Sequence, residues 1–360
     1  MSKKLHRANI GEWSELYVLA VLLTKGGANA ADQNQSAIEE EFHKIVEIFE
    51  CDKDESSVRN YKIFEDTIQI YHGKSLVKEV QNRDVQIKLN KFYHDLEQNR
   101  GKKTFELESG NELLEFLEKD KPSASSSSTE NDLELIMIDK ISGSTTPRIG
   151  FSIKSQLGSA STLLNASGAT NLIFQIHPKQ GVSFSNLPEF QHGKHKSNLI
   201  ALYKSGFYLE FDSFASDQFA RNLKLLDSNM HMYLSKILLT YYSTDLSSLK
   251  DVTEHAYPQN ISENFQPIFK IKEFIGNIAM GMRPSKFWDG DTTKFKGLLI
   301  SKNNGEVLFY HLYNRKSFED YLFNNLRFDR PDTDRHKYGY IYKENEKYLI
   351  KLNLQLRFTK

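Results

Sequence analysis

DLELIMIDKISGSTTPRIGFSIKSQL, residues 132–157, is the stretch of the sequence that most strongly indicates the fold. It predicts two β-strands joined by a turn rich in Gly, Ser, Thr and Pro. Apolar residues alternate along both runs: Leu133, Leu135 and Met137, then Ile149, Phe151 and Ile153. Because side chains alternate between strand faces, Asp132 and Glu134 share one face, while Ser152, Lys154 and Gln156 lie opposite the second apolar triplet. We therefore expect a hairpin with one buried face and one polar face.

The polar face of this hairpin has two interpretations. A carboxylate at the head of one strand and a lysine in the next is an arrangement found in nucleases: the acid holds a divalent metal ion, and the ammonium lies beside the attacking water. However, any half-exposed hairpin presents polar residues on one face, and the acid and the Lys-x-Gln ending are individually common. Only the rest of the chain distinguishes the two.

Four further stretches resemble a known family: GEWSELY (11–17), GFSIKSQLGSASTLLNASGATN (150–171), KNNGEVLFYHLYN (302–314) and YLIKLNLQLRF (348–358). Residues 132–157 resemble the core of the PD-(D/E)xK nuclease superfamily, and the four stretches resemble HpaII-type restriction endonucleases over most of the chain. The resemblance implies a type II enzyme that cleaves double-stranded DNA at CCGG with Mg²⁺. It also implies that Asp132 bridges the metal and the scissile phosphate and that Lys154 orients or helps to deprotonate the attacking water. Gln156 would hold the water or a DNA sugar edge.

The same resemblance implies partners. A palindromic site is read most economically by a two-fold homodimer in which each protomer cuts one strand. A restriction enzyme also implies a cognate DNA methyltransferase in the same system.

The chain departs from the superfamily pattern at Ser152, where a second Asp or Glu is expected. Serine supplies no negative charge for a metal, and residues 155–176 contain no acid that could replace it. The replacement carboxylate must come from Glu134 on the same strand face, or from Glu12 or Glu15 near the N-terminus. A site with one carboxylate, phosphate oxygens and waters can still hold one Mg²⁺, because this ion retains several waters.

Residues 10–25, IGEWSELYVLAVLLTK, predict a buried helix that ends at Gly26 and Gly27. Acids in its first turn often serve only to compensate the helix dipole. In the resembled superfamily an N-terminal helix often contributes an acid to the site, and Glu15, nearer the apolar body, is preferred to Glu12.

Composition is that of an ordinary globular protein, with 39% hydrophobic and 26% charged residues among 360. Equal counts of 47 basic and 47 acidic residues argue against a general nucleic-acid coat, but a specific enzyme needs only a local basic cleft. Cys51, the only cysteine, is expected to be inert. The start lacks the apolar run of a signal peptide, and no stretch approaches a membrane span, so we expect a cytoplasmic protein with no membrane partner.

Small polar residues follow Lys154 in the run 158–171. Ser159 or Ser161 could cap a short helix whose amides face a phosphate, and Ser161 or Asn165 could reach base edges or sugars. A helix packed tightly on the sheet would use small residues equally well. Ser152 is a further candidate for DNA contact, and residues 171–176 predict a third strand of the mixed sheet.

The C-terminal part predicts a hairpin around Asn303, Asn304 and Gly305, a helix, and a second hairpin that ends in a strand over 348–358. The polar face of that strand suits a DNA groove, but it also suits ordinary exposure to solvent. Reading G·C pairs calls for bidentate arginine, and loop residues are candidates: Arg283, Lys286, Arg327, Arg330 and Arg335. His177, His192 and His195 lie in loop-like sequence and favour solvent or phosphate contacts over zinc.

We therefore expect an α/β (α+β) protein with a restriction-endonuclease-like core, a central mixed sheet flanked by helices, and helical and hairpin elaborations. Residues 1–180 would form the nuclease core and 181–360 a DNA-recognition or dimerisation part, although one compact domain is the alternative. Two other functions stay open: a repair or junction nuclease that reads DNA structure, and a non-catalytic DNA- or partner-binding protein whose site decayed at Ser152. Cleavage of branched DNA alone would favour the first, and Mg²⁺-independent binding without cleavage the second.

Overall fold

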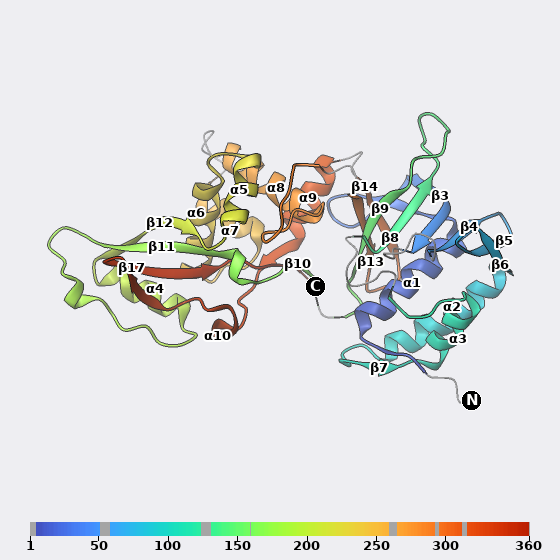
Figure 1. Ribbon diagram of the computed structural model, residues 1–360, viewed down its shortest axis with the longest axis horizontal. Helices are drawn as coiled ribbons and strands as arrows, with labels where there is room; N and C mark the ends of the chain where they lie inside the picture. Colours follow the sequence, from blue (N-terminus) through green and yellow to red (C-terminus); the bar gives the residue numbers. More distant parts are fainter. Residues whose placement is uncertain are drawn as a thin grey trace. The chain divides into compact units, whose positions relative to one another are not determined.

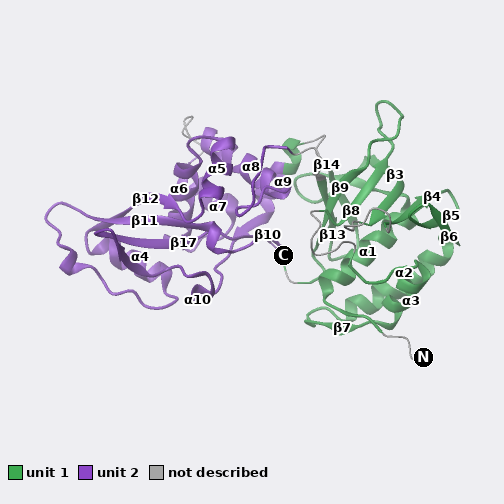
Figure 2. Cartoon of the chain, in the orientation of Figure 1, with its two compact units in different colours: residues 1–161, 292–318, 360 green, residues 162–291, 319–359 purple. Residues whose placement is uncertain are grey.

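The computed structural model describes residues 5–50, 58–123, 131–158, 160–258, 265–291, 295–311 and 315–359. Cys51 and Ser159 lie outside the described residues, so the predictions about them have no structural counterpart. The chain forms two compact units (Figure 2). Unit 1 comprises Met1–Ser161, Thr292–Phe318 and Lys360, and unit 2 comprises Thr162–Asp291 and Glu319–Thr359. The functional division into 1–180 and 181–360 remains a prediction.

Unit 1 is built on a nine-stranded mixed sheet (Figure 1). Its helices are α1 (Ile10–Lys25), α2 (Asn82–Gln98) and α3 (Glu108–Phe116). Its strands are β1 (Arg7–Ala8), β2 (Gly27–Ala31), β3 (Ala37–Glu50), β4 (Arg59–Ile63), β5 (Thr67–His72), β6 (Ser75–Gln81), β7 (Phe105–Glu106), β8 (Leu133–Met137), β9 (Ile149–Ser155), β13 (Phe295–Ser301) and β14 (Val307–His311). The strand order is β2-β14-β13-β9-β8-β3-β4-β5-β6, and β1 pairs separately with β7.

The predicted hairpin occupies the middle of this sheet. β8 and β9 pair antiparallel, with Leu133 opposite Phe151 and Leu135 opposite Ile149. On its other side β9 runs parallel to β13, so the hairpin from the C-terminal part of the sequence completes the N-terminal sheet. The first half of β3 pairs with β2 and the second half with β8 and β4. Strand β9, which carries Lys154, is therefore hydrogen-bonded to a neighbouring strand on both sides.

The core of unit 1 lies between this sheet and α1. The alternating apolar residues of β8 and β9 are buried as predicted. Figure 1 shows α1 against the strands, with α2 and α3 beyond it. Since every residue from 16 to 23 is buried, the helix is covered on nearly all sides, as its apolar sequence indicates. Gly26, with φ of 63°, ends it in the left-handed conformation.

Unit 2 has two smaller sheets with helices against them. Its strands are β10 (Thr162–Leu164), β11 (Asn171–Pro178), β12 (Phe207–Phe214), β15 (Leu326–Phe328), β16 (Ile341–Glu344), β17 (Lys347–Asn353) and β18 (Leu356–Phe358). Its helices are α4 (His195–Lys204), α5 (Asp217–Leu226), α6 (Met230–Ser243), α7 (Leu249–Ala256), α8 (Phe265–Ala279), α10 (Thr333–His336), and the 3-10 turns η2 (Gly168–Thr170) and η3 (Phe184–Asn186). Helix α9 (Arg315–Asn325) begins in unit 1 and ends in unit 2. The strand orders are β12-β11-β17-β16 and β10-β18-β15.

The expected mixed sheet flanked by helices is confirmed, as are the helix at 10–25 and both C-terminal hairpins. Three local predictions were wrong. Residues 160–171 include strand β10 and the turn η2, capped by Ser167, in place of a helix. The strand at 171–178 joins the sheet of unit 2, not the sheet with the hairpin. The last strand breaks after Asn353, whose buried side chain bonds Ser167 and Asn171 instead of facing outward.

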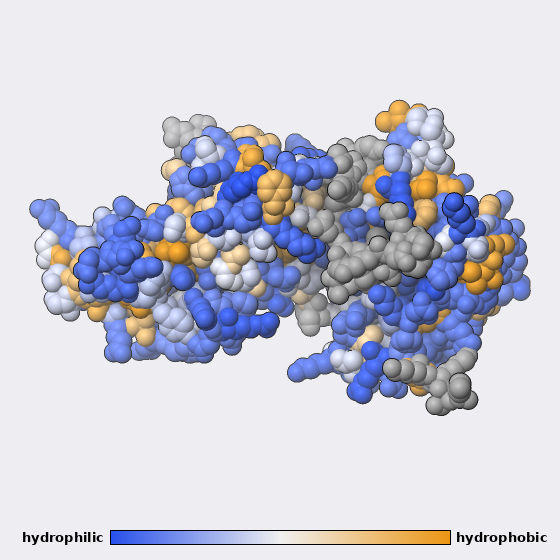
Figure 3. Space-filling view, viewed as in Figure 1, coloured by the Kyte–Doolittle hydropathy of each residue, from blue (hydrophilic) through white to orange (hydrophobic). Residues whose placement is uncertain are grey.

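The visible surface of both units is mainly hydrophilic, with small apolar patches between charged residues (Figure 3). Of the helices in the described ranges, none combines the length and the apolar character needed to cross a membrane.

Candidate active site

The site is built around the start of β8 and the end of β9. Asp132 directly precedes β8, and its backbone N–H donates to the carbonyl of Phe151 at 2.9 Å. Its side-chain Oδ2 accepts a hydrogen bond from the N–H of Ile153 at 2.6 Å. Because Ile153 is the neighbour of Lys154, this bond fixes the carboxylate beside the peptide that carries the lysine. The structure thus places the Asp132 carboxylate at the backbone of Ile153, one residue before Lys154; the catalytic roles of Asp132 and Lys154 remain predictions.

Gly150 on β9 allows the residue before Asp132 to pack against the strand. The side chain of Asn131 lies over Gly150, where an added Cβ would meet Asn131 Nδ2 at 2.0 Å. The backbone at Gly150 can therefore carry no larger residue without displacing Asn131, the residue before Asp132. Asn131 was not among the residues predicted for the site, since nothing in an isolated Asn-Asp pair signals this packing.

Glu15 and Lys154 line one cavity of about 440 Å³ in unit 1. The cavity is formed by the first turns of α1, the loop after α2 and the end of β9. Its walls are Asn9, Ile10, Gly11, Glu15, Gly101, Lys102, Lys103, Ile153, Lys154, Ser155, Gly158 and Ser161. Carboxylate, ammonium and hydroxyl groups here converge on one space, which is the arrangement expected of a binding or catalytic site.

Glu12, the less preferred alternative to Glu15, has a structural role. Its carboxylate accepts from the N–H of Asn9 at 2.8 Å, and Asn9 Oδ1 accepts from the N–H of Glu12 at 3.0 Å. This reciprocal pair is a capping box, which satisfies two amides that the first turn of a helix leaves unpaired. Glu12 is thereby occupied at the helix end, while Glu15 lines the cavity one turn further on.

Two serines join the helix to the strand. Ser14 is fully buried on α1, and Ser155 Oγ donates to Ser14 Oγ at 2.9 Å. Ser14 Oγ in turn donates to the carbonyl of Ile10 at 2.6 Å, and Ser155 Oγ accepts from the N–H of Leu157 at 3.1 Å. Since Ser155 follows Lys154 and Ser14 precedes Glu15, these bonds fix the strand that carries the lysine against the helix that carries the acid.

Gln156 is held from two sides. Its backbone N–H donates to the carbonyl of Ser301 on β13 at 2.8 Å, and its side-chain Nε2 donates to Oε1 of Gln35 at 2.7 Å. The amide group is therefore oriented by Gln35, a residue that the sequence did not single out. The role of Gln156 toward water or a sugar edge remains a prediction.

Glu134 is engaged elsewhere. It forms an ion pair with Arg148, whose guanidinium lies 4.1 Å from the centre of the Phe49 ring. Glu15, in contrast, lines the cavity with Lys154. Among the residues that the structure describes, no preformed group of three or more His, Cys, Asp or Glu is placed to hold a metal ion. The carboxylate oxygens of Asp132 and Glu15 are hard donors, of the kind that suits a divalent ion such as Mg²⁺, which retains waters and binds substrate phosphates.

The remaining predicted residues divide between the units. Ser152 is half-buried on β9, in register with Leu298 of β13, and Ser161 lines the cavity. Asn165, Arg283 and Arg330 belong to unit 2, where all three are exposed. The Arg330 guanidinium lies 5.2 Å from the centre of the Tyr241 ring. Their roles in DNA contact remain predictions.

The histidines are not a loop cluster. His195 begins α4 and is buried; its ring stacks on Tyr338 with 5.0 Å between centroids. Burial lowers the pKa of His195 to about 4, so its imidazole is neutral at pH 7. The prediction of a solvated loop was therefore wrong for His195, whereas His192 is exposed and lies 3.2 Å from Asp334.

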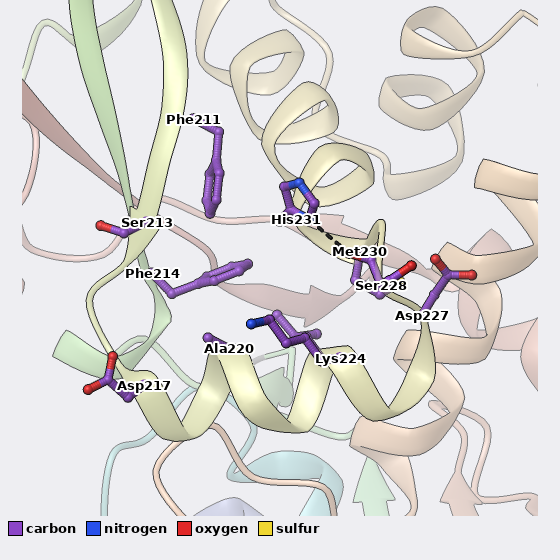
Figure 4. Close-up of a pocket in the computed structure, with 11 residues that line it drawn as sticks. Phe211, Ser213, Phe214, Asp217, Ala220, Lys224, Asp227, Ser228, Met230 and His231 are labelled. Atoms are coloured by element: carbon purple, nitrogen blue, oxygen red, sulfur yellow. Dashed lines mark hydrogen bonds between the residues drawn. The ribbon is translucent and has the colours of Figure 1, made fainter.

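A second cavity, of about 300 Å³, lies in unit 2 between β12 and α5 (Figure 4). Phe211 and Phe214 project from the strand toward Ala220 and Lys224 of the helix, and His231 bonds the carbonyl of Ser228 at 3.0 Å. None of the predicted site residues lines this cavity. Glu15, Lys154 and Ser161, by contrast, line the cavity of unit 1.

Known proteins resemble this chain over nearly its whole length. The model of the HpaII restriction endonuclease family matches residues 9–358. The chain is 35% identical over 360 residues to the type II restriction enzyme HpaII of Haemophilus parainfluenzae, covering 97% of this chain and 98% of that protein. No solved structure matches. Restriction endonucleases act on DNA, and type II enzymes generally use divalent metal ions. The chain belongs to the HpaII restriction endonuclease family and is a type II site-specific restriction endonuclease.

Proposed function

We propose that this chain hydrolyses both strands of DNA at CCGG with Mg²⁺, and that the active site is the corner formed by Asp132, Lys154 and Glu15. The observation that carries the proposal is the hydrogen bond from the Ile153 N–H to Asp132, which holds a carboxylate at the backbone one residue before the lysine. The shared cavity of Lys154 and Glu15 supports it.

The groups present match the needs of phosphodiester hydrolysis. A water oxygen forms a bond to phosphorus, the bond to the leaving sugar oxygen breaks, and that oxygen takes up a proton. When bound, Mg²⁺ would be held by Asp132 and Glu15 and would offset the phosphate charge. As an ammonium, Lys154 orients the attacking water and stabilises the charge that develops on the phosphate oxygens, while the proton that the water loses passes to solvent. Gln156, already oriented by Gln35, holds the water or a sugar edge.

Ser152 makes a single metal ion the simpler arrangement. Recruiting Glu134 as a further ligand would first require breaking its ion pair with Arg148. Glu15 shares the cavity with Lys154, and α1 is fixed against β9 by the bond between Ser14 and Ser155. We therefore assign the second carboxylate to Glu15 and keep Glu134 as the less favoured donor.

Recognition and assembly rest on the family. Membership of the HpaII family supports the proposal of CCGG as the site, and we also propose a homodimer with one active site for each strand and a cognate methyltransferase. Arg283 and Arg330 are proposed to read or contact the site, because guanine O6 and N7 are matched by a guanidinium. Ser152, Ser161 and Asn165 are proposed as further DNA contacts.

Digestion of a sequenced plasmid, with Mg²⁺ and with EDTA, tests this function. Discrete fragments that form only with Mg²⁺ and end within CCGG are the expected result. Nicking or a smear would indicate an enzyme that reads DNA structure, and an uncut plasmid that is still bound would indicate a binding protein. Either of these outcomes would overturn the proposal.

A further inference from the structure

The loop that follows α2 brings two lysines to the active-site cavity. Lys102 and Lys103 line it together with Lys154, although about fifty residues separate them in sequence. Both lysines are exposed, and Gly101 before them has φ of 88°, a conformation that favours glycine. An added Cβ at Gly101 would meet no atom within 4 Å, so its backbone conformation, rather than space, accounts for the glycine.

This loop is anchored at both ends. Arg100 donates to the carbonyl of Asn303 in the β13–β14 turn at 2.6 Å. Beyond the lysines, the carbonyl of Phe105 accepts from Trp13 Nε1 at 3.2 Å. Trp13 lies on α1, two residues before Glu15. The lysines are therefore presented on a loop tied to the helix and the sheet that form the cavity, and this preorganisation reduces the entropy cost of binding.

The charges of the two lysines are poorly compensated. Lys102 donates to the neutral amide oxygen of Asn99 at 2.6 Å, and within the described part of the chain Lys103 has no ion pair or hydrogen bond. By contrast, Lys78 and Lys91 of the same unit each pair with a glutamate. Three ammonium groups against the single carboxylate of Glu15 make the cavity attractive to anions, in a chain whose net charge is zero.

We infer that Lys102 and Lys103 form a phosphate-binding subsite for the DNA backbone beside the scissile phosphate. The inference rests on the proposed function, because the anion is taken to be DNA. A cavity of about 440 Å³ has the size of small-ligand sites and exceeds the needs of one phosphate group. The lysines neutralise neighbouring phosphates and fix the position of the strand, whereas Asp132 and Lys154 act at the reacting phosphate.

Salt dependence of DNA binding tests the subsite. The affinity of a CCGG duplex is measured in EDTA, where no cleavage occurs, for the wild type and for Lys102→Ala/Lys103→Ala at a series of salt concentrations. Loss of two phosphate contacts makes the negative slope of log K against log salt shallower by about 1.8. The ratio of wild-type affinity to variant affinity therefore shrinks about tenfold between 50 and 200 mM salt. Lys103→Arg, which retains the charge, keeps the wild-type slope.

Lys74→Ala is the matched control, since Lys74 is an exposed lysine in the β5–β6 turn at the far edge of the same sheet. It should bind like the wild type. An unchanged slope for the double variant would overturn the subsite, even if Asp132→Ala abolishes cleavage and so upholds the proposed function. A wild type that neither binds nor cuts DNA would overturn both.

Discussion

At the scale of single residues, Glu12 and Glu15 provide a comparison within one helix turn. Glu12 belongs to the capping box, and Glu15 lines the cavity with Lys154. Glu15→Gln removes a proposed metal ligand and should lower the cleavage rate by about 10²-fold. Glu12→Gln should leave rate and stability nearly unchanged, because glutamine also completes a capping box. Single-turnover cleavage and thermal unfolding measure both; equal rates for the two variants would exclude Glu15 from the site.

His195 makes the stability of the fold depend on pH. Its pKa is lowered to about 4 by burial and by the nearby Arg330, whereas the unfolded chain titrates near pH 6.5. Between these values the unfolded chain binds a proton that the folded chain excludes. The stability that the fold gains by keeping His195 neutral is therefore fully present above pH 6.5. It is lost as the pH falls toward 4, and the loss in the free energy of unfolding reaches up to about 3 kcal/mol.

Urea unfolding at several pH values should show this loss in the wild type and a flatter profile over the same window in His195→Gln. Parallel profiles for the two proteins would show that His195 does not cause the pH dependence.

At the scale of elements, the bond between Ser14 and Ser155 joins α1 to β9. The variants Ser14→Ala and Ser155→Ala and their double variant should show a coupling of about 1 kcal/mol in the free energy of unfolding, since the hydroxyls share one hydrogen bond. A second cycle, in which Thr24→Ala replaces Ser14→Ala, serves as the control. The Thr24 hydroxyl bonds only to carbonyls within α1, so it should not couple to Ser155→Ala. Equal coupling in both cycles would contradict a specific link between helix and strand.

Gly158 allows α1 to approach the chain after β9. An added Cβ would lie 2.2 Å from Cγ2 of Ile10, so Gly158→Ala should lower stability by about 1–3 kcal/mol and slow cleavage by distorting the cavity. At Gly168, where no atom lies within 4 Å of an added Cβ, alanine should have little effect. Denaturation and cleavage rates check both variants, and a neutral Gly158→Ala would show that this close approach is not required.

At the scale of the whole molecule, the sequence predicted those parts whose signals are local. Alternation along 132–157 located the hairpin, and the apolar run closed by Gly26 located α1. The break after Asn353 was missed because the alternation continues through it, whereas the structure buries Asn353 among hydrogen-bond partners about 180 residues away. No local pattern reveals such a partner.

For the candidate site, too, the sequence predicted only what local patterns determine. The bond between Asp132 and the Ile153 N–H follows from the hairpin register, which the sequence pattern specifies. The proximity of Glu15 depends on the packing of α1 against β9, for which the family resemblance was the only guide. Lys102 and Lys103 stand in a polar loop that resembles any other, and only the tertiary arrangement places them beside Lys154.

The central claim is that the corner between β8 and β9 performs the hydrolysis. The most direct measurement is the rate of Mg²⁺-dependent cleavage of a CCGG duplex by Asp132→Ala and Lys154→Ala, with binding to the same duplex measured in EDTA. Both variants should still bind the duplex but should cleave at least about 10²-fold more slowly than the wild type. Cleavage at the wild-type rate by either variant would contradict the assignment of this corner as the active site.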